Sequence, residues 1–193
     1  MKVDAAEYRA VPLRVHTLLA DVPLHDVWAV DLPRIGEAAA LDAFHRISYQ
    51  FRVIERLPAP VRALFALRFF LGRVLRLEEQ PKGAGTASFT NGLTADDRAR
   101  SSPAPGTPDG LFQVVYRFPN EVLLEVHNRT VHGALLTTLA PVEAGYRFYL
   151  AVYVLKAGWL TAGYMALIDP FRRWIIYPAL LTRIRAIWEE AAH

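Results

Sequence analysis

The sequence predicts a single α+β domain, in which an antiparallel sheet packs against helices. Four runs of strand-like composition follow one another over residues 111–155, separated by turns of hairpin length. Helical periodicity precedes them at 37–49 and 60–77 and follows them at 158–188. A chain of 193 residues has the size of one domain, so residues 1–193 are expected to form one unit.

The composition narrows the classes of protein that the chain can belong to. It has no cysteine, which excludes disulfides and thiolate chemistry and fits a reducing compartment. The formal net charge is only +3 and Arg172–Arg173 is the one adjacent basic pair, so no nucleic-acid partner is expected. The most apolar run, 148–168, is interrupted by Lys156 and by glycines, whereas a membrane span needs about 20 apolar residues. No secretory signal is recognisable, so a cytoplasmic location is expected.

The N-terminal third predicts one strand and two helices. Residues 1–20 lack clear periodicity, and the first strand is predicted at 25–32, where apolar and strand-favouring residues alternate. A first helix is predicted at 37–49 from the helical spacing of its apolar residues. A second, 60–77, opens with a proline in its first turn and carries leucines along one face.

Residues 78–110 are rich in Gly, Pro, Ser and Asp, and Phe89 and Leu93 are their large apolar residues. Such a segment buries little surface, so a flexible loop is predicted across 78–110. A flap over a cavity mouth is the functional alternative, and a short strand at 87–90 is a local one.

The meander that follows contains four predicted strands, at 111–118, 121–127, 130–139 and 146–155. Two-residue turns are expected at 119–120 and 128–129, and a looser turn at 141–145.

These turns define a register for the predicted sheet. Tyr116 would lie opposite Leu123, Val114 opposite Glu125, and Glu125 opposite His132. One sheet face would then carry Phe112, Tyr116, Phe118, Glu125, His127, Thr130 and His132.

The C-terminal segment predicts a helix that is interrupted by prolines. Residues 158–168 have helical character, Asp169-Pro170 restarts the segment, and Pro178 is expected to kink or restart it again. An apolar stripe at helical spacing is expected to lie on the sheet, and its members are Trp174, Tyr177, Leu181, Ile184 and Trp188.

Several stretches of the chain carry a resemblance to a known family. They are the hairpin from Glu121 to His132, the segment Gly158-x4-Gly163-Tyr164-Met165-x2-Ile168-x-Pro170-Phe171, and the run Ile175-Ile176-Tyr177-Pro178-Ala-Leu-Leu181. In these stretches the chain resembles the family called domain of unknown function 2867, whose members also occur fused to short-chain dehydrogenases. The strand at 20–32 and the helix around Leu64-x2-Leu67-Arg68 look similar too. Arg172 departs from the pattern, since the family often has histidine after Pro-Phe.

The order of the elements also resembles the START-like, helix-grip fold of the SRPBCC superfamily. The resemblance implies a curved antiparallel sheet wrapped around a long C-terminal helix, two shorter helices after the first strand, and an apolar cavity between sheet and helix. It implies no established reaction.

Candidate chemistry is concentrated in the predicted meander. Glu125 and His132 are the best acid–base pair, because a carboxylate beside an imidazole can orient it for proton transfer; a structural hydrogen-bonded pair is the alternative. His127 and His132 have a spacing that could bind a metal across a hairpin, but no third ligand has suitable spacing, so neither a metal nor a cofactor is expected. Nucleophile-elbow, P-loop and GxGxxG motifs are absent from the sequence.

Binding of a small hydrophobic or amphipathic molecule, between the sheet and the C-terminal helix, is the function that the sequence favours. The expected lining residues are Tyr116, Glu125, His132, Tyr149, Tyr153, Trp159 and Tyr164, and ordinary core packing is the alternative for the aromatic ones. An enzyme is the less favoured reading: a cyclase- or hydrolase-like protein that uses Glu125 and His132 for proton transfer. A peripheral membrane or protein-interaction module is the third hypothesis.

Overall fold

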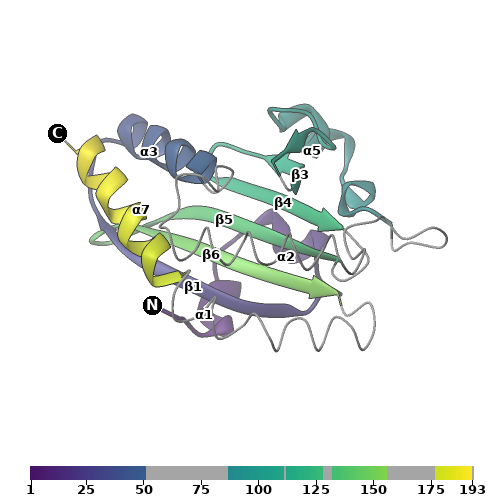
Figure 1. The fold of residues 1–193 in the computed structure, drawn as a ribbon, viewed down its shortest axis with the longest axis horizontal. Coiled ribbons are helices and arrows are strands. Elements are labelled where there is room, and N and C mark those ends of the chain that lie inside the picture. The colour runs from purple at the N-terminus through teal and green to yellow at the C-terminus, as the bar shows by residue number, and fades with distance from the viewer. Residues whose placement is uncertain (51–86, 111, 128–131, 156–176, 193) are drawn as a thin grey trace, which may run out of the picture.

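The computed structural model is built on one curved antiparallel sheet (Figure 1). It describes residues 1–50, 87–110, 112–127, 132–155 and 177–192. Six strands lie within these ranges, in the spatial order β1-β6-β5-β4-β3-β2. They are β1 Leu24–Pro33, β2 Pro108–Asp109, β3 Phe112–Arg117, β4 Glu121–His127, β5 His132–Val142 and β6 Gly145–Leu155. The predicted α+β class and the predicted meander are confirmed.

The hairpin turns agree with the prediction at one of three places. Phe118 N donates to the Glu121 carbonyl, which closes the predicted two-residue turn at 119–120. The β4–β5 connection is longer than predicted, because His127 pairs with His132 and leaves residues 128–131 outside the described ranges. The β5–β6 turn is tighter than predicted, because both strands extend until Val142 pairs with Gly145.

An irregularity in β3 changes which side chains share a face. Val114 pairs with Leu124 and Tyr116 pairs with Leu123, so Val115 is an extra residue in the strand. The predicted Tyr116–Leu123 pair is confirmed, whereas Val114 does not lie opposite Glu125. Phe112 therefore packs on the sheet face opposite Tyr116, and its predicted place beside that tyrosine is wrong.

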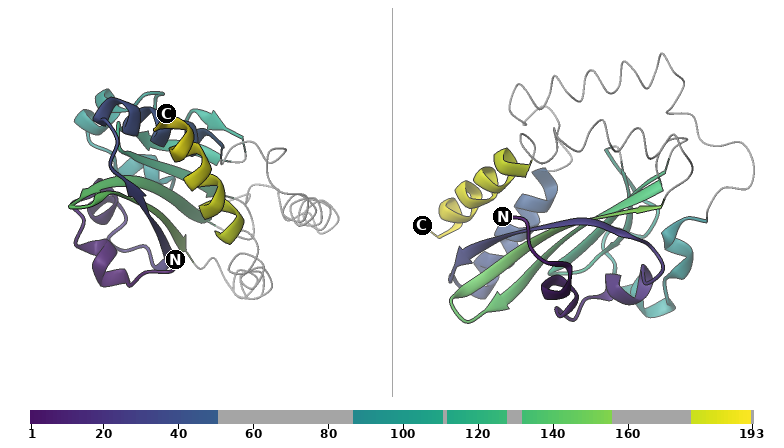
Figure 2. Two further views of the ribbon diagram at one scale, coloured as in Figure 1. Left: turned by 90° about the vertical axis from the view of Figure 1, so that its left-hand side faces the viewer. Right: turned by 90° about the horizontal axis from the view of Figure 1, so that it is seen from below.

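One face of the sheet is covered by short N-terminal and central helices, here called the N-terminal layer. They are α1 Ala5–Arg9, α2 Arg14–Leu18, the 3-10 helix η2 Phe89–Gly92 and α5 Ala95–Arg100. The buried side chains of these helices and of the residues that end them contact one side of the central strands, and these side chains are Tyr8, Val15, Leu19, Phe89 and Leu93. Figure 2 shows α1 on the side of the sheet away from α7.

The segment predicted as a flexible loop, 78–110, contains regular secondary structure in its described part, residues 87–110. This part holds η2, α5 and β2, and Phe89 and Leu93 are both buried. Helix caps compensate for the scarcity of apolar residues: Ser88 caps η2, and Thr94 with Asp97 forms a capping box on α5. No strand forms at 87–90: Ser88 caps η2, and Phe89 and Thr90 begin it.

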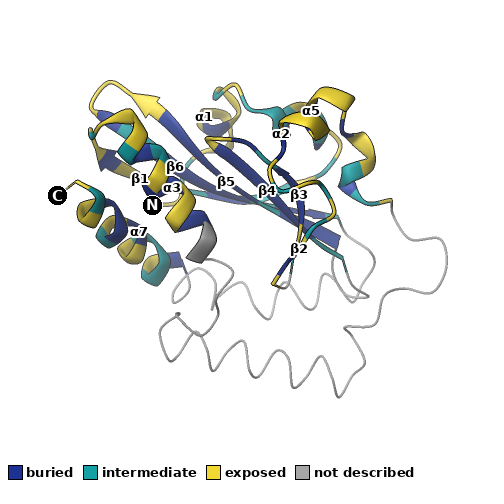
Figure 3. Cartoon of the chain, turned by 90° about the horizontal axis from the view of Figure 1, so that it is seen from above, coloured by how far each residue is buried: buried dark blue, intermediate teal, exposed yellow. Residues whose placement is uncertain are grey.

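The opposite face of the sheet is covered by α3 Glu37–Gln50 and α7 Tyr177–Ala191, here called the helical layer. The predicted first helix at 37–49 is confirmed. The apolar stripe of the C-terminal helix is confirmed for its described members, Tyr177, Leu181, Ile184 and Trp188, whereas Trp174 lies outside the described residues. Pro178 occupies the first turn of α7, where the missing N–H costs nothing. The strands are buried along most of their length, while the outer sides of α5 and α7 are exposed (Figure 3). The predicted helix at 60–77 and the segment 158–168 lie outside the described residues.

Candidate functional site

Glu125 and His132 form a buried pair on the face that the N-terminal layer covers. Glu125 Oε1 lies 2.6 Å from His132 Nε2. The two residues are diagonal neighbours, because Glu125 pairs with Ala134 and His132 with His127. The predicted direct pairing is wrong by two residues. An offset of two keeps both side chains on one face, so the predicted contact forms.

The Glu125 carboxylate also holds the start of η2. It accepts hydrogen bonds from Ser88 Oγ at 2.7 Å and from Phe89 N at 3.3 Å. Burial, the largest single influence, raises the pKa of Glu125, but the hydrogen bonds from His132, Ser88 and Phe89 together lower it below its ordinary value. Glu125 is therefore a carboxylate that fastens the 87–92 segment to the sheet.

His132 is sandwiched between two aromatic rings. The Phe89 ring lies 4.2 Å from it with an interplanar angle of 18°, and the His127 ring lies 4.3 Å from it with an angle of 26°. Two nearly parallel rings cannot share one face of an imidazole, so they cover both. His132 is 1% exposed. Burial, followed by the nearby His132, lowers the pKa of half-buried His127, against the opposing effect of Glu125.

This burial bears on the hypothesis of proton transfer. A catalytic base must come within hydrogen-bond reach of its substrate. His132 is 1% exposed, its Nε2 lies on Glu125 Oε1, and each Glu125 oxygen accepts from protein groups. The contacts of this pair are structural: they hold β4, β5 and η2 together.

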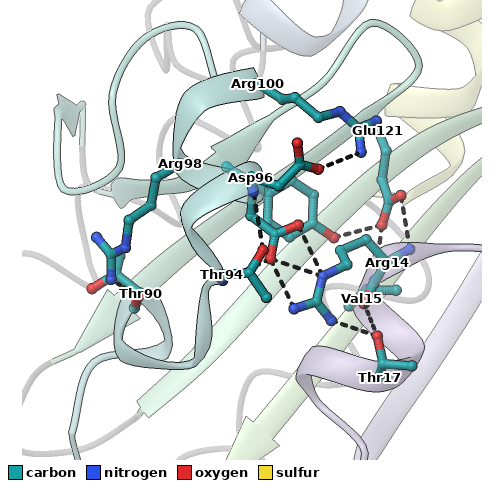
Figure 4. Close-up of polar contacts among 11 residues, drawn as sticks. Arg14, Val15, Thr17, Thr90, Thr94, Asp96, Arg98, Arg100 and Glu121 are labelled. Atoms are coloured by element: carbon teal, nitrogen blue, oxygen red, sulfur yellow. Dashed lines mark hydrogen bonds and ion pairs between the residues drawn. The ribbon is translucent and has the colours of Figure 1, made fainter.

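Glu121 lies four residues before Glu125 on β4 and also joins a helix start to the sheet, which the sequence did not predict. Its carboxylate accepts from Arg14 N at 3.1 Å, from Val15 N at 3.0 Å and from Tyr116 Oη. Leu13 provides no side-chain cap for α2, so Glu121 satisfies donors at that helix start (Figure 4). Burial, and then the charge of Glu121, raises the pKa of Tyr116 well above its ordinary value, which keeps the phenol protonated as a donor.

The predicted lining residues separate into two groups. Tyr116, Glu125, His132, Tyr149 and Tyr153 all lie on the face of the N-terminal layer, not on the face that carries α7. Tyr153 Oη lies 3.0 Å from Tyr8 Oη, and Tyr149 Oη donates to Glu7. Trp159 and Tyr164 lie outside the described residues.

The face that carries α7 has its own polar group, at the start of that helix. Tyr177 Oη donates to the buried Asp26 carboxylate, 3.1 Å and 3.4 Å from its two oxygens. The Trp28 ring lies 4.7 Å from the Tyr177 ring. The Trp28 indole N–H is buried and has no hydrogen-bond partner. We name these three residues the Asp26 corner.

Beside the Asp26 corner, the sheet presents three half-buried apolar side chains, Val126, Leu135 and Val152, here called the open patch. Val152 pairs with Asp26 on one side and with Leu135 on the other, so the patch adjoins the corner directly. By contrast, Ser48 of α3 contacts Thr137 one row further along, where the sheet is fully buried. The helical layer therefore covers one end of this face more closely than the other.

Two observations concern the membrane hypothesis. Within the described part of the chain, no helix has the length and apolar character needed to cross a bilayer. The exposed large apolar side chains among the described residues are Met1 and Val142.

The histidine cluster, which we define as Glu125, His127 and His132, also brings together a donor set that metals use. One nitrogen or oxygen from each residue lies within 4.8 Å of the others. The histidine spacing lacked a third ligand in the sequence. Glu125 supplies it, and the signal that could have found it is the two-residue spacing from His127, which puts both on one face of a strand.

A family model described as "Protein of unknown function (DUF2867)" matches residues 18–179, a span that includes all strands of the sheet, the histidine cluster and the Asp26 corner. No match was found among curated proteins.

Proposed function

The chain belongs to this DUF2867 family, and we propose that it binds a small, uncharged hydrophobic or amphipathic molecule against the open patch and the Asp26 corner. The arrangement would be START-like, with the ligand held between the sheet and the C-terminal segment. The observation that carries the proposal is the buried indole N–H of Trp28, which lacks a partner beside a half-buried apolar surface.

An unpartnered donor in this position supports a ligand with a hydrogen-bond acceptor. A buried polar group without a partner costs about 1–3 kcal/mol, so such groups are rare unless something else satisfies them. A carbonyl or hydroxyl oxygen of a ligand would accept from the Trp28 indole. The rest of the ligand would lie on Leu135 and Val152, whose burial stabilises the complex by about 25 cal/mol per Å².

The charge of the site supports an uncharged ligand. Asp26 is 4% exposed and accepts from Tyr177. An anionic head group would meet the Asp26 carboxylate, and repulsion between like charges at low dielectric is expensive. A neutral ketone, quinone or alcohol avoids this cost.

The test measures binding of a neutral probe and of an anionic one. Nile red, which is neutral and carries a carbonyl, is expected to bind wild-type protein more tightly than cis-parinaric acid, an anion. Leu135→Gln places an amide in the open patch and is expected to weaken Nile red binding at least about fivefold, equivalent to about 1 kcal/mol. Val142→Gln, on the same strand but exposed at the hairpin, is the matched control and should leave binding unchanged.

Native mass spectrometry of protein from its own host supplies the second arm. A bound small molecule is expected, and its mass would identify it. Absence of both a bound molecule and any Nile red uptake would refute the proposed function, as would an equal loss of affinity in the two glutamine variants.

A further inference from the structure

We propose that Glu125, His127 and His132 bind one divalent transition metal ion, for which Zn²⁺ is the best match. One ligand atom from each residue already lies within 4.8 Å of the other two. Bonds from zinc to nitrogen and oxygen measure about 2.0–2.2 Å, so two ligands of one ion lie about 3–4 Å apart. Short side-chain movements therefore suffice to close the site.

The donor set selects the class of metal. Two imidazoles and one carboxylate suit Zn²⁺, Co²⁺ and Fe²⁺, whereas Mg²⁺ and Ca²⁺ prefer ligands that are all oxygen. Three protein ligands leave a tetrahedral ion with one further position for water.

The surroundings of Glu125 supply the support that metal ligands have in proteins. Ser88 Oγ donates to Glu125 Oε2 and Phe89 N donates to Oε1, which fixes the carboxylate plane. The Phe89 ring packs on His132 and fixes that imidazole. Contacts of this kind, made to the side chains that bind the metal, orient those side chains and raise metal affinity. Glu125 and His132 are thus already positioned before an ion arrives.

His127 is the ligand that must move. Its ring is nearly parallel to His132, and lone pairs in parallel rings point side by side instead of toward one point. His127 is half-buried and is the last residue of β4, whereas His132 is 1% exposed. A turn of the His127 ring would close the site from the solvent side. The hydrogen bond between His132 Nε2 and Glu125 Oε1, 2.6 Å long, would be replaced by two bonds to the ion.

The test uses untagged full-length protein, stripped of metal by chelation and dialysis. Isothermal titration with ZnCl₂ is expected to give one ion per chain, and CoCl₂ is expected to produce the visible absorption of tetrahedral Co²⁺. MgCl₂ should give no heat of binding. His127→Ala should weaken Zn²⁺ binding at least tenfold and abolish the Co²⁺ absorption, while the far-ultraviolet circular dichroism stays unchanged.

Two further variants keep the result interpretable. His45→Ala removes an exposed histidine from α3 and is the matched control; it should bind Zn²⁺ as the wild type does. Glu125→Gln keeps an acceptor for Ser88 but loses the charge, and it should bind at least tenfold more weakly. Adventitious binding only, seen as equal affinities in wild type, His127→Ala and Glu125→Gln, would overturn the proposal. So would failure of the wild type to bind Zn²⁺ at one ion per chain.

Discussion

At the indole nitrogen of Trp28, the structure makes a prediction about stability as well as binding. Trp28→Phe removes an N–H that is buried without a partner and keeps an aromatic ring against Tyr177. The free energy of unfolding is therefore expected to stay the same or to rise by about 1 kcal/mol, although large core side chains usually cost stability when they are shortened.

Urea denaturation followed by circular dichroism measures this change. The same variant should bind Nile red about tenfold more weakly, because the bound carbonyl loses its donor. Tyr177→Phe is the contrasting control: it removes a donor to Asp26 and should lower the free energy of unfolding. A fall in stability of similar size in Trp28→Phe would show that the indole has a partner in the folded protein.

The ion pair between Arg14 and Asp97 predicts a pH dependence. The hydrogen bond from Arg14 lowers the pKa of Asp97 to about 2, against the opposing effect of burial and with help from Thr94. Because the folded pKa lies below the unfolded one, the stabilisation is complete above about pH 4 and is lost as the pH falls toward 2. Asp97→Asn is therefore expected to lower the free energy of unfolding by about 1–2 kcal/mol at pH 7 and by almost nothing at pH 2.

Urea titrations at several pH values test this, with Asp96→Asn as the control. Asp96 pairs with Arg100 on the surface, where its side chain is 75% exposed, and such pairs contribute about 0–1 kcal/mol. The prediction fails if the two asparagine variants lose the same stability, or if the loss in Asp97→Asn does not depend on pH.

At this scale, sequence reasoning found contacts whose partners lie within one hairpin. Glu125 and His132 are seven residues apart, and an error of two in the register left them on the same face. The role of Glu121 was missed because the backbone donors that it accepts from, at Arg14 and Val15, lie more than a hundred residues earlier. Caps supplied by a distant strand have no local signature.

Among the elements, the β5–β6 hairpin depends on the absence of a side chain at Gly145. Its φ is +154°, and a Cβ atom there would lie 2.4 Å from the Leu32 carbonyl oxygen and 2.7 Å from Arg34 N. Gly145→Ala is therefore expected to lower the free energy of unfolding by about 2 kcal/mol or more, because backbone of β1 must move away.

Thermal denaturation monitored by circular dichroism provides the measurement. Gly36→Ala is the control, since a Cβ atom at that position meets no atom within 4 Å and should cost less than about 1 kcal/mol. Equal destabilisation by both substitutions would contradict the close approach between β1 and the hairpin.

The segment from 87 to 110 shows what composition leaves out. Its few apolar residues predicted a loop, yet the described part contains η2 and α5. These helices are held by side-chain caps and by ion pairs and hydrogen bonds with charged side chains of other elements. Burial of Phe89 and Leu93 accounts for part of this order. The rest comes from the hydrogen bonds and ion pair of the Glu125 and Asp97 carboxylates. Their partners are distant in the chain, so the composition of residues 87–110 cannot reveal them.

For the whole molecule, stability depends on the N-terminal layer that covers one face of the sheet. The N-terminal layer contributes Tyr8, Val15 and Leu19 to the core, each at most 2% exposed. Truncation of one such side chain typically costs 2–5 kcal/mol, and a domain has about 5–15 kcal/mol in total. Deletion of residues 1–19 is therefore expected to abolish cooperative unfolding, although the family match begins only at residue 18.

Size-exclusion chromatography and urea denaturation of the truncated chain test this expectation. A double substitution of exposed residues in the same region, Arg9→Ala with Asp21→Ala, should leave the unfolding transition intact. A truncated chain that unfolds cooperatively, with unchanged stability, would show that this layer is dispensable.

The division of the helices between the two faces of the sheet also explains which part of the site could be predicted from the sequence. Alternation within β4 to β6 predicted the strands and the shared face of Tyr149 and Tyr153, because a strand has a fixed period of two. It could not say which helices cover that face. Residues 1–20 have no clear periodicity, so the C-terminal helix was assigned to the wrong side of these tyrosines.

The pairing of β1 with β6 sets an order of events during synthesis. Pro33 pairs with Gly145, so the partner strand of β1 is synthesised roughly 110 residues after β1. At about 5–20 residues per second, this interval lasts several seconds, during which β1 has no sheet to join. The meander β3 to β6, whose partners are neighbours in the chain, can form as soon as it emerges, and β1 then adds to its edge. The newly made chain therefore exposes an unpaired apolar strand, and chaperones that recognise such segments are expected to bind it at β1.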